Sequence, residues 1–112
     1  MSRDAYAHAL LTLYVGLPQT ALRRASAADR RLAAQLFDQG VPMTTVQTAI
    51  LIALDRRAAR PPGLPPLPPI RSLAYFLPVI EELRLEPPDP EYLGFLLARR
   101  QRDHIPTDAD ER

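Results

Sequence analysis

The sequence predicts an all-α protein, a small bundle of four to five helices with a proline-rich crossover between the third and the fourth. Apolar residues recur at intervals of three and four along the chain, and no segment alternates apolar and polar residues as a strand would. The chain has 112 residues, of which 46% are hydrophobic and 24% are charged, values typical of one globular domain. We expect that domain to cover residues 1–102 and residues 103–112 to form a disordered tail.

The first helix is expected over the segment that follows Ser2. Either Ser2 or Asp4 can cap its start, and Gly16 and Pro18 end it. Its apolar face is formed by Tyr6, Leu10, Leu13, Tyr14 and Leu17.

The second and third helices are expected to form a hairpin. Ser26 caps the second helix, Asp29 lies favourably near the positive end of its dipole, and the helix ends near Gln39. The third helix begins at Pro42 or Thr44 and ends in arginines. Its apolar residues are Val46, Ile50, Leu51, Ile52, Ala53 and Leu54. Because they surround most of the helix, we place this helix at the centre of the bundle.

Residues 61–69, which we call the proline ladder, contain six of the 13 prolines of the chain. Proline fixes φ and lacks a backbone donor, so the ladder is expected to follow an extended polyproline path. We expect it to act as a stiff strut, with Leu64 and Leu67 laid on the core. The alternative is a ligand role, since Pro62-x-x-Pro65-x-x-Pro68 matches the pattern that aromatic grooves bind.

Two further helices are expected after the ladder. Ser72 caps the fourth helix, and Pro78 within it predicts either a kink or a restart. Its inward residues are Leu73, Phe76, Leu77, Ile80 and Leu83. Asp89-Pro90-Glu91 predicts the start of the fifth helix, with an N-cap, an N1 proline and a first-turn acid. Its inward residues are Tyr92, Leu93, Leu96 and Leu97.

The side chains present do not form a recognisable catalytic, cofactor or metal site. The chain has no cysteine, and neither His8 nor His104 has a second ligand at metal-binding spacing. Glu81-Glu82 is the acidic pair beside a core helix, but adjacent helical residues point about 100° apart, which favours a solvated face. We therefore expect a protein that is not an enzyme and that holds neither metal nor cofactor.

The absence of cysteine makes the reducing cytoplasm the expected compartment, and hydropathy indicates a protein that does not enter a membrane. The longest unbroken apolar run, residues 49–54, is far shorter than a membrane span. Residues 1–60 carry eight Arg against four Asp, a net +4, whereas residues 61–112 carry six Arg against nine acids, a net −3. This asymmetry could orient a partner or a homo-oligomer.

Residues 36–46 have the layout of a helix-turn-helix, with Gly40 at the turn. In that interpretation the third helix would present Met43, Thr44, Gln47 and Thr48 to a major groove. The six apolar residues after Thr48 favour an ordinary helical hairpin instead.

The segments Leu36-Phe37-Asp38-Gln39-Gly40-Val41-Pro42 and 69–82 together resemble a family of small uncharacterised bacterial proteins. More distantly, residues 30–84 are similar to the C-terminal helical domain of DnaD-like primosome and phage replication proteins. Tyr75, Val79 and Leu83 have the spacing of the Tyr-x-x-x-Ile-x-x-x-Trp motif of that domain, with leucine in the place of tryptophan. This resemblance implies a helical fold and single-stranded DNA binding.

The leading hypothesis is an accessory protein of DNA replication or mobile-element maintenance that binds DNA or a replication or recombination protein. Phosphate contacts would come from Arg56, Arg57, Arg60, Arg71, Arg99 and Arg100. Tyr75 could stack on a base. The alternative is a structural adaptor, or a small subunit of a larger assembly, without direct contact to nucleic acid.

Overall fold

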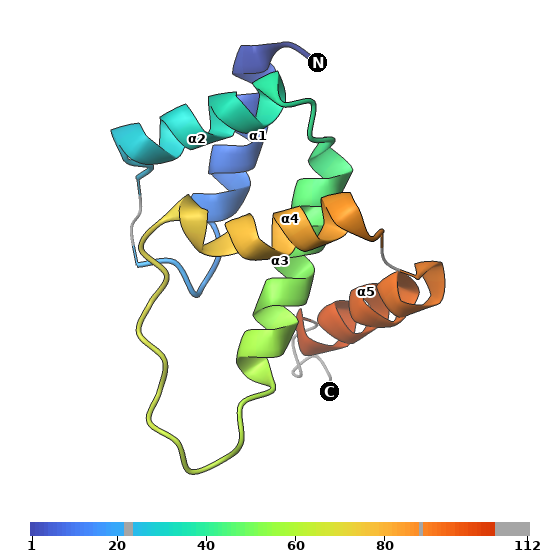
Figure 1. The fold of residues 1–112 in the computed structure, drawn as a ribbon. Coiled ribbons are helices and arrows are strands. Elements are labelled where there is room, and N and C mark those ends of the chain that lie inside the picture. The colour runs from blue at the N-terminus through green and yellow to red at the C-terminus, as the bar shows by residue number, and fades with distance from the viewer. Residues whose placement is uncertain (22–23, 88, 105–112) are drawn as a thin grey trace, which may run out of the picture.

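The computed structural model describes residues 1–21, 24–87 and 89–104, with side chains beyond Ala98 left undescribed. Within these ranges the protein is all-α, which confirms the predicted fold class. The helical segments are α1 Arg3–Val15, α2 Ala27–Asp38, α3 Met43–Ala58, the 3-10 helix η1 Leu73–Phe76, α4 Leu77–Leu85 and α5 Pro90–His104 (Figure 1).

The first two helices begin at serine caps: Ser2, one of the two caps expected for α1, and Ser26, the cap expected for α2. Ser2 Oγ accepts a hydrogen bond from the Ala5 amide at 3.1 Å, and Ser26 Oγ accepts one from the Asp29 amide at 3.0 Å. Gly40 follows the end of α2 with φ of 77°, a left-handed conformation that costs glycine little because it has no Cβ.

Helix α3 forms the centre of the bundle, as its apolar circumference predicts. Its buried residues are Val46, Ala49, Ile50, Ile52, Ala53 and Leu54. Both α4 and α5 pack against it, and α4 crosses it in the view of Figure 1. The same core cluster includes Tyr6, Leu10 and Leu36, so α1 and α2 are part of one hydrophobic core.

Asp29, in the first turn of α2, is a fully buried carboxylate with 1% exposure. One oxygen accepts from the Ser26 amide at 3.1 Å, and the other accepts from the Leu73 amide at 3.0 Å. The carboxylate therefore joins the start of α2 to the start of η1, which lies 44 residues later. The local pattern around Ser26 predicted the cap but not this distant partner.

Pro78 restarts the helical path, the second of the two outcomes expected at this residue. Residues Leu73–Phe76 form a 3-10 turn, and α4 begins at Leu77 with Pro78 in its first turn. Proline is compatible there because the first amides of a helix have no acceptor within the helix. The expected fourth helix is thus η1 followed by α4.

The proline ladder is exposed along its whole length, so the expectation that Leu64 and Leu67 lie on the core was wrong. Leu64 is 52% exposed, and Figure 1 shows the ladder as a long loop that leaves α3 and returns to η1. Gly63, with φ of 91°, lies at the turn of this loop. A leucine side chain cannot reach the core from a segment that turns outward.

The end of the ladder is held by a short pairing with the segment after α1. The Ile70 amide donates to the Gln19 carbonyl at 2.7 Å, and the Ala21 amide donates to the Ile70 carbonyl at 2.8 Å. Ile70 is itself buried. The ladder is therefore anchored at this end, although its middle is open to solvent.

Helix α5 begins where Asp89-Pro90-Glu91 predicts, and an Asp89 carboxylate oxygen accepts from the Glu91 amide at 2.8 Å. Of the four residues expected to point inward, only Leu96 is buried; Leu93 is half-buried, and Tyr92 and Leu97 are exposed. The helix continues to residue 104, two residues past the expected end of the domain, and residues 105–112 lie outside the described residues.

Candidate interaction surfaces

Arg56, near the end of α3, forms a two-pronged ion pair with Glu82 of α4, at 2.9 and 3.0 Å. The hydrogen bond from Arg56 holds the pKa of Glu82 below its ordinary value, and the same bond raises the pKa of Arg56. Both side chains are more than half exposed, so the pair orients α4 on α3 more than it stabilises the fold. Arg56 is thus engaged within the molecule.

Arg57 links α3 to both the ladder and η1. Its guanidinium donates a hydrogen bond to the Pro68 carbonyl and lies 5.8 Å from the centre of the Tyr75 ring. This distance is within the range of a cation–π interaction. Tyr75 remains exposed beside this contact, so Arg57 and Tyr75 form a small surface feature rather than part of the core.

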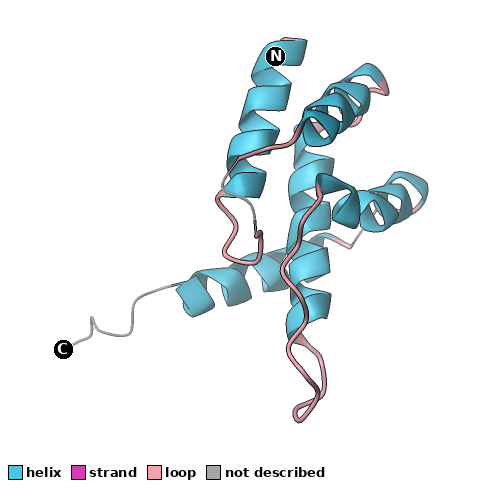
Figure 2. Cartoon of the chain, turned by 90° about the vertical axis from the view of Figure 1, so that its left-hand side faces the viewer, coloured by secondary structure: helices cyan, strands magenta, loops and turns pink. Residues whose placement is uncertain are grey.

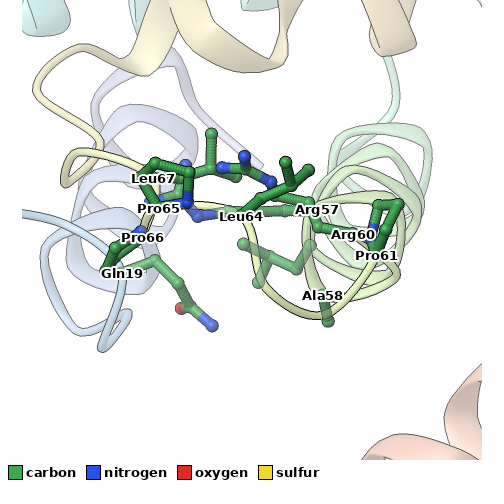
Figure 3. Close-up of a pocket in the computed structure, with 10 residues that line it drawn as sticks. Gln19, Arg57, Ala58, Arg60, Pro61, Leu64, Pro65, Pro66 and Leu67 are labelled. Atoms are coloured by element: carbon green, nitrogen blue, oxygen red, sulfur yellow. The ribbon is translucent and has the colours of Figure 1, made fainter.

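A hollow of about 350 Å³ lies between the end of α3 and the ladder. Arg57 and Ala58 line it from the helix, Arg60 lines it just after the helix end, and ladder residues such as Leu64 line it from the loop (Figure 3). Gln19 lines it from the segment after α1. The Gln19 Oε1 atom is buried, and no described residue donates a hydrogen bond to it.

The arginines predicted to bind nucleic acid are not equivalent in the structure. Arg57 and Arg60 line the same hollow, whereas Arg56 is paired with α4. Arg71 is exposed just after the ladder. The side chains of Arg99 and Arg100, on α5, lie outside the described residues.

The exposed large apolar residues of α5 and of the end of α4 are Leu85, Tyr92, Phe95 and Leu97. Tyr92 and Phe95 share one face of α5, which we call the α5 surface. Phe95 is 54% exposed and Leu85 is 87% exposed. The sequence offered a signal for this surface: apolar residues 92, 93 and 95–97 cover more of a helix than one packing face requires.

A further hollow, of about 520 Å³, lies at the start of α1 and along α2. We call it the arginine hollow; it is lined by Arg3, Ala27, Arg30, Arg31, Ala34 and Gln35. None of these residues was among the predicted site residues. The spacing of Ala27, Arg31 and Gln35, four residues apart, was the available signal for a shared face on α2.

Within the described residues, no group of three or more His, Cys, Asp or Glu side chains could hold a metal ion. No helix there has the length and hydropathy needed to cross a membrane.

Comparison of the chain with protein-family models, with curated proteins and with solved structures found no match. The DnaD-like resemblance therefore stays a prediction.

Proposed function

We propose that this protein is a non-enzymatic adaptor, or small subunit of a larger assembly, that binds another protein through the α5 surface. The observation that supports it is the exposure of large apolar side chains on a helix whose buried side already contacts α3. Tyr92 and Phe95 are three residues apart and so lie on one face of α5. Large apolar side chains that are exposed on one face of a helix are typical of protein interaction sites.

The charges around the α5 surface indicate the chemistry of the partner. Glu86, at the end of α4, and Asp89 and Glu91, at the start of α5, are exposed and lie next to the apolar side chains in sequence. We therefore expect a partner with an apolar patch edged by Arg or Lys, since complementary charges speed encounter and fix orientation.

A second candidate is the accessory role in DNA replication implied by the DnaD-like resemblance. The side chains of Arg60 and Arg71 form no hydrogen bond or ion pair among the described residues, and the Tyr75 ring is exposed. These groups could contact phosphate and base. We favour the adaptor because Arg56 and Arg57, from the same predicted site, are engaged within the molecule. In either role we expect the protein to act in the cytoplasm.

The adaptor proposal is tested by placing a photo-crosslinking amino acid at Phe95 in cells that make the protein. A matched variant carries it at Thr12, an exposed residue of α1. A protein captured from Phe95 and not from Thr12 is then purified and titrated against the chain. Phe95→Asp should weaken this purified complex at least about tenfold, and Thr12→Asp should leave it unchanged.

Two results would overturn the adaptor. Equal capture from both positions would show that the α5 surface has no selective partner. A purified complex insensitive to Phe95→Asp would place the contact elsewhere on the molecule. Crosslinks between two copies of this chain would replace the partner by a homo-oligomer, which sedimentation of the purified protein would verify.

A further inference from the structure

The arginine hollow has a lining with net positive charge. Three of its six lining residues are arginines, and none is Asp or Glu. Ala27 and Ala34 are small, which leaves room between the arginines of α2. The hollow extends along α2 from Ala27 to Gln35, and at its Ala27 end the positive end of the helix dipole favours an anion.

The arginines of the hollow retain donors for a ligand. The Arg31 side chain forms no hydrogen bond or ion pair among the described residues. Arg30 donates through one nitrogen to the Ala25 carbonyl at 3.0 Å, and its other donors stay available. Arg3 pairs with Asp38 at 2.9 Å, but both side chains are more than half exposed, so this weak pair can exchange.

We propose that the arginine hollow binds phosphate groups of a nucleic-acid backbone. The planar guanidinium fork matches two phosphate oxygens, and three arginines suit successive phosphates of a strand better than a single small anion. None of the residues that line the hollow is aromatic, so none would stack on a base. This lining favours backbone contacts without sequence preference over the binding of one nucleotide.

This site is separate from the α5 surface and does not depend on the proposed protein partner. Figure 1 shows α1 and α2 at one end of the molecule and α5 at the other. It also differs from the arginines at the end of α3 that the sequence singled out. A protein with both surfaces would hold a partner protein next to nucleic acid.

The test is fluorescence anisotropy with labelled duplex DNA, single-stranded DNA and single-stranded RNA over a series of salt concentrations. Three phosphate contacts predict a slope of log affinity against log salt of about −2.7 for a duplex and about −2.1 for a single strand. The double variant Arg30→Ala/Arg31→Ala should lower affinity at low salt at least about tenfold and remove about 1.8 from the duplex slope.

The charge-matched control for Arg31→Ala is Arg84→Ala, since Arg84 lies on α4 and does not line the hollow. Arg31→Ala should remove about 0.9 from the duplex slope, and Arg84→Ala should leave binding nearly unchanged. Ala34→Met fills the hollow without changing charge and should also weaken binding, while circular dichroism verifies the fold of each variant. The proposal is overturned if no oligonucleotide binds, if Arg31→Ala leaves binding unchanged, or if Arg84→Ala weakens binding as much as Arg31→Ala does. Binding of pyrophosphate without any oligonucleotide would assign the hollow to free phosphate and overturn it as well.

Discussion

Helices α3 and α5 both carry apolar residues on more than one face, but the fold treats them differently. α3 has six buried residues and is contacted by η1, α4 and α5. α5 packs principally on α3 and buries Leu96 alone among its described side chains. Figure 2 shows α5 running across α3 and extending past the other helices at its C-terminal end. An apolar pattern therefore shows which residues prefer burial, whereas neighbouring elements decide which of them are buried.

The ladder resembles α5 in this respect. Leu64 and Leu67 are apolar and were expected to be buried, yet both are exposed. Ile70, at the anchored end of the ladder, is buried. Apart from Met1, the exposed large apolar side chains of the described residues thus lie after α3 in the chain. That half of the sequence also carries the net negative charge.

The largest change in the free energy of unfolding is expected at α3, the helix that the fold covers. Leu54→Ala should lower the free energy of unfolding by about 2–5 kcal/mol, because it removes a buried side chain and leaves a cavity beside α3. Thermal and urea unfolding measure this change. A variant as stable as the parent would mean that α3 is not packed on all sides.

The sequence predicted the fold best where the signals are local. Ser2, Ser26 and Gly40 mark helix ends through side-chain or backbone properties that act within a few residues, and each occupies the expected position. The position of α3 was also predictable, because only a surrounded helix gains from apolar residues on all sides. The bond from the Leu73 amide to Asp29 could not be predicted, since nothing in the local sequence identifies a partner 44 residues away.

The candidate surfaces were predicted less well, for a related reason. The arginines after α3 were chosen for their charge, but whether an arginine is available depends on groups such as Glu82 and the Pro68 carbonyl, which the fold brings to it. Arg30 and Arg31 were not predicted as binding residues, because the hollow beside them forms only when α1 packs against α2.

The second expected effect is a loss of stability at alkaline pH that depends on the buried Tyr14 and not on the exposed Tyr92. Burial, with a smaller contribution from Asp29, raises the pKa of Tyr14 to about 12 from 10.0. The folded state thus favours the neutral phenol of Tyr14. Its contribution to the free energy of unfolding, about 2–3 kcal/mol, is fully present below pH 10 and is lost as the pH rises from 10 to about 12.

Tyr14→Phe should flatten this alkaline loss, measured by urea unfolding across the range, and Tyr92→Phe on α5 is the control. At neutral pH Tyr14→Phe should keep the stability of the parent, because the buried hydroxyl has no hydrogen-bond partner among the described residues. An alkaline loss that is unchanged in Tyr14→Phe would contradict the assignment to this residue.

A smaller effect is expected in the ladder. Pro65→Ala should lower the free energy of unfolding by about 0.4–1 kcal/mol, because alanine allows the unfolded chain more conformations while little packing is lost. Leu64→Ala is the matched test of side-chain burial and should change stability less than Leu54→Ala does. If Leu64→Ala cost as much as Leu54→Ala, the ladder would be covered in solution, as a strut on the core requires.

The smallest effect is expected at the exposed phenylalanine of α5. Phe95→Ala removes a large side chain that is 54% exposed, so the free energy of unfolding should change by less than about 1 kcal/mol, against about 3–5 kcal/mol for a buried phenylalanine. Phe76→Ala, at a fully buried site of η1, is the control for the larger value. The measurement is urea unfolding at several protein concentrations. A large and concentration-dependent cost at Phe95 would mean that the α5 surface is buried between copies of this chain, and the difference between α3 and α5 would then vanish in the assembled state.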